Sequence, residues 1–132
     1  MPTVRTLKTG ISGVRGVVGD SLTPQLLVGF GQAFGTYLDG GSVVLGRDTR
    51  PSGEMVRNAL IGGLLACGCE VIDVGIAPVP TIQHAVRRLG ADGGIAITAS
   101  HNPQEWNALK FIHRDGILLR PYQAEELLAV YY

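Results

Sequence analysis

A serine with polar neighbours stands directly after an apolar run. Residues 98–103 read TASHNP and follow the run GIAI at 94–97, so Ser100 is expected just beyond the carboxyl end of a strand. Open α/β sheets bind their ligands at the carboxyl ends of strands, where a hydroxyl can meet a substrate. Pro103 fixes its own φ and disfavours helix at Asn102, which restricts the shape of the loop. Ser100 is therefore the first candidate for chemistry in this chain.

Two kinds of reaction use a serine oxygen as a carrier, acyl transfer and phosphoryl transfer. The nucleophile of an α/β hydrolase usually lies in a Gly-x-Ser-x-Gly turn, but Thr98 and Asn102 occupy the glycine positions here. His101 follows Ser100 directly, and neighbouring side chains of an extended segment point to opposite faces, so His101 is poorly placed to deprotonate Ser100. The pattern favours phosphoryl transfer over serine hydrolysis.

Phosphoryl transfer needs cations that offset the charge on the phosphate oxygens. A phosphorylated serine carries about −1.5 to −2 charges at neutral pH. The basic side chains expected in loops or near strand ends, at one edge of the sheet, are Arg15, Arg47, Arg50 and Lys110.

The glycine-rich opening, residues 8–19, places four glycines three apart around Ser12 and Arg15. Glycine allows a backbone to approach a phosphate closely, and its N–H groups can then cradle the anion. The segment lacks the Gly-Lys-Ser/Thr of a Walker loop. A phosphate-binding loop and a glycine-rich turn whose Arg15 faces water are equally compatible with this spacing.

A second basic segment, residues 46–53, follows the apolar run 42–45 and carries Arg47 and Arg50. Two arginines at the carboxyl end of a strand could bind an anionic ligand. A structural network between Arg47 and Asp48 that only shapes the loop has at least equal support.

Strands and helices alternate along the chain. Strands are expected at 42–45, 70–75, 94–97 and 108–113, with a turn at Asp115-Gly116 leading to an antiparallel partner at 117–119. Helices are expected from the cap Thr23 to about Leu38, from the cap Ser52 to Gly68, from the cap Thr81 to about Leu89, and from Pro121 onward. The order predicts an α/β fold: a three-layer αβα sandwich with a mainly parallel mixed sheet and an antiparallel edge.

Composition limits the class of protein. The chain has 132 residues, enough for one domain, with 45% apolar and 17% charged residues. Eleven basic and eleven acidic side chains balance, so no overall field recruits nucleic acid or a membrane surface. Cys67 and Cys69 are too close for an easy disulfide and lack zinc-site spacing, and no segment reads as a leader or a membrane span, so we expect inert thiols and a cytoplasmic location.

The motifs together resemble a known family. Residues 98–103, followed by Asn107 and Lys110, resemble the phosphoserine loop of the α-D-phosphohexomutases, which include phosphoglucomutase, phosphomannomutase and phosphoglucosamine mutase. Residues 10–16 resemble the amino-terminal loop of that family, and residues 46–53 its second glycine-arginine-aspartate segment. The three motifs occur in the family's order and cover nearly the whole chain.

This resemblance implies a role for each candidate residue. Ser100 would be phosphorylated, would pass its phosphoryl group to a hexose phosphate, and would take back the other phosphate of a hexose 1,6-bisphosphate, which also serves as activator. The phosphate on Ser100 would bind Mg²⁺. Lys110, His101 and Arg15 match catalytic positions of the family, and the phosphate-binding candidates are Ser12, Arg47, Arg50 and Asn102.

The resemblance covers only the first of the family's four domains. The scattered aspartates of this chain include no Asp-x-Asp-x-Asp metal loop, which the family carries in its second domain. We therefore expect residues 1–132 to be domain I, with domains II–IV absent, and to be inactive without those partners. Glucose or mannose phosphate is favoured as substrate. A phosphoglucosamine mutase domain, and a non-catalytic phosphate- or nucleotide-binding module, remain as alternatives.

Overall fold

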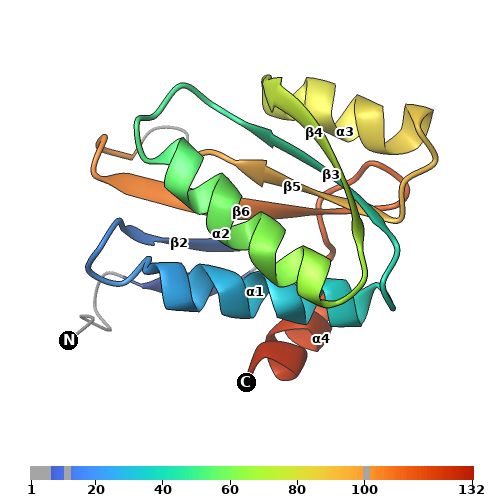
Figure 1. Ribbon diagram of the computed structural model, residues 1–132, viewed down its shortest axis with the longest axis horizontal. Coiled ribbons are helices and arrows are strands. Elements are labelled where there is room, and N and C mark those ends of the chain that lie inside the picture. The colour runs from blue at the N-terminus through green and yellow to red at the C-terminus, as the bar shows by residue number, and fades with distance from the viewer. Residues whose placement is uncertain (1–6, 11–12, 100–101) are drawn as a thin grey trace.

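The computed structural model describes residues 7–10, 13–99 and 102–132. Six strands form one mixed sheet in the order β1-β2-β6-β5-β3-β4. The strands are β1 (Lys8–Gly10), β2 (Gly13–Val17), β3 (Ser42–Arg47), β4 (Glu70–Ile76), β5 (Gly93–Ile97) and β6 (Trp106–His113). The pairs β5–β3 and β3–β4 are parallel, and the remaining three pairs are antiparallel. The mixed α/β sandwich predicted from the sequence is confirmed (Figure 1).

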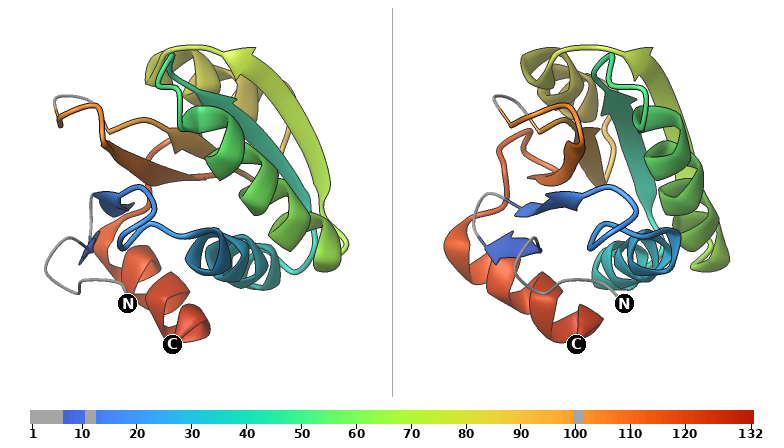
Figure 2. Two further views of the ribbon diagram at one scale, coloured as in Figure 1. Left: turned by 60° about the vertical axis from the view of Figure 1, so that its left-hand side comes forward. Right: turned by 90° about the vertical axis from the view of Figure 1, so that its left-hand side faces the viewer.

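Helices cover both faces of the sheet. They are α1 (Pro24–Tyr37), α2 (Gly53–Ala66), α3 (Val79–Arg88) and α4 (Pro121–Tyr131). Side chains of α1, α2 and α4 share one buried cluster with Leu45, Ile97 and Leu109 of the sheet, whereas α3 closes a smaller cluster on the other face. Figure 2 shows α3 apart from the other three helices. In the described part of the chain, no helix is both long and apolar enough to cross a membrane.

The ends of the helices follow local sequence signals only in part. Thr23 caps α1 as expected, since its Oγ1 accepts a hydrogen bond from the Leu26 N–H at 3.2 Å. Gly68, with φ of 78°, follows the end of α2. Ser52 is the N-cap residue of α2 as expected, but its hydroxyl makes no capping bond. The cap expected at Thr81 is wrong, because α3 already begins at Val79, after Pro78.

The antiparallel part of the sheet is wider than an edge. The glycine-rich opening forms the hairpin β1–β2, and β2 pairs with β6, which therefore lies inside the sheet. The expected partner strand at 117–119 makes only an isolated bridge between Leu118 and Ile112. The expected antiparallel edge of 108–113 and 117–119 left out β1 and β2, because these short, glycine-rich strands carry too little apolar alternation to be read as strands.

Helices α1 and α2 touch backbone to backbone. A Cβ placed on Gly31 of α1 would lie 2.7 Å from the carbonyl oxygen of Leu60 in α2. The glycines of α1 thus serve close helix packing, as the sequence indicated, rather than nucleotide binding. Cys69 lies buried beside Gly35 of α1, and burial, together with the nearby Cys67 and Asp92, raises the pKa of its thiol. Both cysteines are free thiols.

The close packing of α1 against α2 leads to a prediction about the free energy of unfolding. Gly31→Ala should destabilise the fold by about 1–3 kcal/mol, because the added methyl group meets backbone that cannot move aside. Gly62→Ala is the matched control, since a Cβ at this exposed position of α2 meets nothing within 4 Å. The control should be neutral or stabilising by up to about 1 kcal/mol. Urea unfolding of both variants checks this, and equal midpoints would contradict it.

Candidate active site

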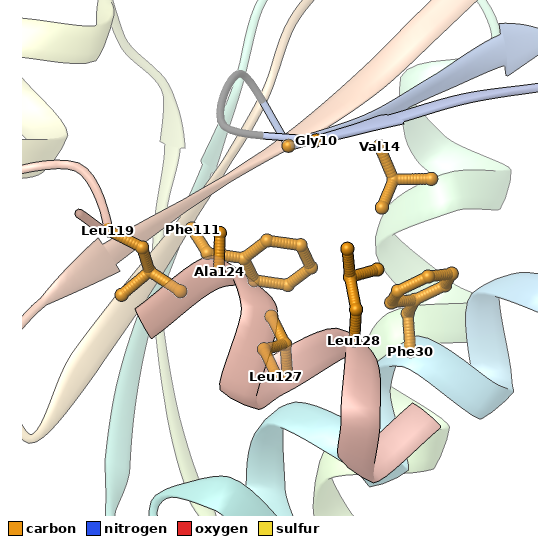
Figure 3. Close-up of a pocket in the computed structure, with 9 residues that line it drawn as sticks. Gly10, Val14, Phe30, Phe111, Leu119, Ala124, Leu127 and Leu128 are labelled. Carbon is orange, nitrogen blue, oxygen red and sulfur yellow. The ribbon is translucent and has the colours of Figure 1, made fainter. Parts of the chain in front are cut away.

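Two concave regions differ in chemistry. One lies beneath the β1–β2 hairpin and is walled by carbon side chains of the sheet, α1 and α4, including Val14, Phe30, Phe111, Leu127 and Leu128 (Figure 3). Because the described residues that line it offer no charged side chain and no side-chain hydrogen-bond donor, it does not suit a phosphorylated sugar. The candidate site must lie elsewhere.

The second region is an open polar hollow at the carboxyl ends of the parallel strands β3 and β5. It is lined by residues 48–51 of the loop after β3, and by Asn102 and Gln104 of the loop after β5. Ligand sites of α/β sheets form at this edge. The hollow is therefore where the motifs at 46–53 and 98–103 meet, as the sequence predicted.

Arg50 joins the two loops. Its Nη1 donates to the carbonyl oxygens of Pro103 at 2.8 Å and Trp106 at 3.1 Å, and its Nη2 donates to the Asn102 carbonyl oxygen at 2.8 Å. Its Nε donates to the Asp48 carboxylate at 3.2 Å. An aspartate-centred network that shapes the loop was one of the two sequence interpretations, and the described contacts of Arg50 match it, with Arg50 in place of Arg47.

Asn107 is a buried polar residue whose role the sequence left unassigned. Its side chain is fully buried, donates to the Ser52 Oγ at 2.9 Å, and accepts from the Ala108 N–H at 2.8 Å. This use of Ser52 explains why its hydroxyl does not cap α2. An amide directly before the apolar residues Ala108 and Leu109 of the expected strand was the available signal, because a buried amide requires hydrogen-bond partners.

Arg15 and Lys110 lie on one face of the sheet. Arg15 of β2 is opposite Ala108 of β6, and Lys110 is two residues further along β6, so the two basic residues are diagonal neighbours about 7–8 Å apart, and somewhat less at Cβ. The Thr98 N–H donates to the Ala108 carbonyl oxygen at 3.1 Å, which places Arg15 two strands away from the start of the loop that holds Ser100. The expectation that both residues lie in loops or at strand ends is wrong, because both belong to strands.

Arg47 does not join them. It alternates with Gly46, whose Cβ position would meet Ile82 of α3, so Arg47 faces α2, and its side chain lies against Gly53. On that face Arg57 of α2 forms an ion pair with Asp73 of β4. Arg47 lies close enough to this pair to lower the pKa of Asp73. The cations predicted at one edge are therefore divided between the two faces of the sheet.

Three candidates, Ser12, Ser100 and His101, lie outside the described residues. Asn102 is half-buried, its N–H donates to the Ala99 carbonyl oxygen at 3.0 Å, and it lines the hollow. In the described ranges, no group of three or more His, Cys, Asp or Glu could hold a metal ion. The carboxylate that lines the hollow in this part of the chain, Asp48, binds Arg50. These residues do not by themselves fit a resident Mg²⁺.

The fold and the hollow define an α/β domain in which the loops after two parallel strands meet at one polar hollow. The chain belongs to the phosphoglucomutase/phosphomannomutase family, whose alpha/beta/alpha domain I it matches over residues 6–131.

Several known proteins are similar to the chain. It is 52% identical over 116 residues to a phosphoglucomutase/phosphomannomutase of Thermococcus kodakarensis, covering 84% of this chain and 25% of that protein. It is 51% identical over 118 residues to a "Probable phosphoglucosamine mutase" of Pyrococcus abyssi, covering 89% of this chain and 26% of that protein. The chain thus spans about a quarter of the length of these curated relatives.

Solved structures are similar to the chain in fold as well as in sequence. A crystal structure of a phosphomannomutase-like protein from Thermus thermophilus matches the whole chain with a TM-score of 0.89 and 34% identity, and the match covers 31% of that protein. A phosphoglucomutase/phosphomannomutase family protein from Burkholderia thailandensis matches 99% of the chain with a TM-score of 0.81 and 32% identity, and the match covers 30% of that protein.

The buried pair Asn107–Ser52 makes a prediction that a double-mutant cycle checks. Asn107→Ala should cost about 1–3 kcal/mol, because it leaves the Ala108 N–H without its acceptor and Ser52 without its donor. Ser52→Ala should cost less. Unfolding of both single variants and the double variant should give a coupling energy of at least about 0.5 kcal/mol, and additive effects would contradict the contact.

The Arg57–Asp73 pair predicts a pH dependence. Burial raises the pKa of Asp73, but hydrogen bonds from the Gly75 N–H and Arg57, with the charges of Arg57 and Arg47, outweigh it and lower the pKa overall. The pair therefore stabilises the fold above the unfolded-state pKa of about 3.9, and this contribution is lost as the pH falls through the lower folded-state pKa.

Asp73→Asn tests this dependence. Because both side chains are about one third exposed, the variant should lose less than about 1 kcal/mol at pH 7. The difference from wild type should vanish at a pH well below about 3, where the carboxyl is protonated in both states. Urea unfolding across this range checks the sign, and a difference that grows as the pH falls would contradict it.

Proposed function

We propose that the chain is the phosphoserine domain of an enzyme that interconverts hexose 1-phosphate and hexose 6-phosphate. The observation that carries this proposal is the antiparallel pairing of β2 with β6, which sets Arg15 and Lys110 on one face of the sheet. Arg15 is then two strands away from β5, after which the loop that holds Ser100 begins. Two basic side chains on one sheet face suit a substrate with a phosphate group. Membership of the mutase family supports the same reaction.

The proposed reaction has two balanced steps. In the first, the bond between phosphorus and the Ser100 Oγ breaks, a bond forms between phosphorus and a free hydroxyl oxygen of the hexose phosphate, and the hydroxyl proton passes to the Ser100 Oγ or to a base. In the second, after the bisphosphate has reoriented, the bond between its other phosphorus and the sugar oxygen breaks, a bond forms between that phosphorus and the Ser100 Oγ, and the Ser100 hydroxyl proton passes to the sugar oxygen or to a base. Ser100 ends each cycle phosphorylated, so no outside phosphate donor is consumed.

The other candidates receive roles within this proposal. Arg15 binds a phosphate group of the substrate, and Lys110 and His101 assist proton transfer, while Ser12 and Asn102 are phosphate-binding candidates. Magnesium would counter the charge of the phosphate on Ser100. Its remaining ligands, like the groups that recognise the sugar, are assigned to domains II–IV of the parent chain.

The sugar is the least determined part of the proposal. Glucose or mannose phosphate agrees with the name of the relative from Thermococcus kodakarensis, and glucosamine phosphate agrees with that of the relative from Pyrococcus abyssi. Turnover of the full-length enzyme with glucose, mannose and glucosamine phosphates, each at saturating concentration, would rank the three substrates.

Ser100→Ala in the full-length enzyme tests the reaction. Loss of the oxygen that carries the phosphoryl group should lower kcat by more than about 10³-fold. Intact-mass analysis should find one added phosphoryl group on the wild-type protein after incubation with hexose 1,6-bisphosphate, and none on the variant. Normal turnover by the variant would refute the proposal, and reversible phosphate binding without a covalent adduct would favour a non-catalytic module.

A further inference from the structure

Arg50 bridges two loops that are far apart in the sequence. It lies in the loop after β3, but its guanidinium group donates three hydrogen bonds to the main chain beyond β5: to Asn102 and Pro103 of the loop, and to Trp106, the first residue of β6. These three acceptors are backbone carbonyl oxygens. The contact therefore depends on the path of the loop rather than on its side chains.

The guanidinium group is itself held in place. The Asp48 carboxylate accepts from the Arg50 Nε at 3.2 Å, and it also accepts from the Arg50 backbone N–H at 3.0 Å. Only 12% of the Arg50 side chain is exposed. Because the guanidinium plane is rigid, a group fixed at Nε also fixes the directions in which Nη1 and Nη2 donate. Asp48 thus holds the two donor nitrogens of Arg50, Nη1 and Nη2, in a fixed orientation, and this pair of donors is called the fork of Arg50.

The described part of the loop buries little apolar surface that could keep its shape. Pro103, Gln104 and Glu105 are exposed. Besides the pairing of Trp106 with Val17 in the sheet, the backbone bonds of residues 102–106 run from the Asn102 N–H to Ala99, from the Trp106 N–H to Pro103, and from the Val18 N–H to the Glu105 carbonyl oxygen. Of these three bonds, only the one from Val18 reaches another part of the chain. The fork of Arg50 supplies three more such links from the side of β3.

We propose that Arg50 is a positioning residue that fixes the backbone of residues 102–106, and thereby the loop that carries the phosphoryl group, before any substrate binds. This inference rests on the proposed function for its catalytic consequence, but the positioning itself does not. It differs from the expectation that Arg50 binds the phosphate of the substrate. A phosphate ligand acts when the ligand is present, whereas a positioning residue acts in the free protein.

The free chain offers a direct probe, because Trp106 is its only tryptophan and its carbonyl oxygen accepts from Arg50. We expect Arg50→Gln to raise the acrylamide quenching of Trp106 about twofold or more. Amide hydrogen exchange at Asn102, Trp106 and Val18 should accelerate about 10- to 100-fold, because removing charge-assisted hydrogen bonds lowers the cost of local opening. Arg50→Lys should fall between wild type and Arg50→Gln, since an ammonium group lacks the planar fork.

Arg57→Gln is the matched control. It also removes an arginine that pairs with an aspartate, but Arg57 contacts Asp73 of β4 and Asn58 of its own helix rather than the loop. Its exchange rates at Asn102 and Trp106 should remain within about twofold of wild type. Equal rates in Arg50→Gln and wild type would overturn the proposal, and so would equal acceleration in Arg57→Gln and Arg50→Gln.

A milder variant covers the case in which Arg50→Gln fails to fold. Asp48→Asn keeps the three bonds to the loop possible but removes the charge that orients the fork, and it should accelerate exchange at Trp106 about three- to tenfold. Exchange at the core residue Leu45 should stay unchanged. Unchanged exchange at Trp106 in a folded Asp48→Asn would count against the proposal.

Kinetics of the full-length enzyme separate positioning from phosphate binding. A positioning role predicts that Arg50→Lys lowers kcat about 10- to 100-fold and changes KM less than about threefold. A phosphate ligand would mainly raise KM and leave exchange at Trp106 in the free protein unchanged. If Ser100→Ala retained turnover while Arg50→Gln loosened the loop, the proposed function would fail and the positioning role would stand. A rigid loop in Arg50→Gln, with an inactive Ser100→Ala, would overturn the positioning role and leave the proposed function standing.

Discussion

The antiparallel pairing of β2 with β6 is the constraint on which the site depends. It carries the glycine-rich opening of the chain across the sheet and sets Arg15 opposite Ala108. The hairpin approaches β6 so closely that a Cβ on Gly13 would collide with the Leu109 carbonyl oxygen, and Gly13 also has φ of 95°. Only glycine meets both demands at once. The backbone of the first strands, rather than any loop contact, therefore brings the first basic motif to the third.

Much of the architecture was readable from the sequence because its signals are local. The apolar run 94–97 became the fully buried strand β5, and the pair Thr23-Pro24 began α1 where expected. The opening segment was not readable as strands, because β2 gains its stability from pairing with β6, almost a hundred residues away, and β1 from pairing with β2. Because these two strands were not predicted, the sequence also underestimated the width of the antiparallel part of the sheet.

The candidate site was predicted in location but not in its internal contacts. Two motifs were expected at the carboxyl ends of two strands, and they line one hollow. Which arginine serves which purpose depends on strand alternation at Arg47 and on the long reach of the Arg50 side chain. Ser52 has the residue type of a helix cap, yet its hydroxyl binds Asn107 instead. Local propensity identified these residues, and tertiary contacts decided their partners.

The glycine contact between α1 and α2 has a mechanical consequence for the hollow. No side chain separates the two backbones at Gly31 and Gly63, so there is no compliant layer through which one helix could slide over the other. The two helices are thus expected to move together as one rigid unit. Ser52 lies at the N-terminal end of α2, about 16 Å along the helix from Gly63. The loop that leads from β3 into α2, and that lines the hollow, is therefore anchored to a rigid helix pair whose closest contact lies well away from the hollow.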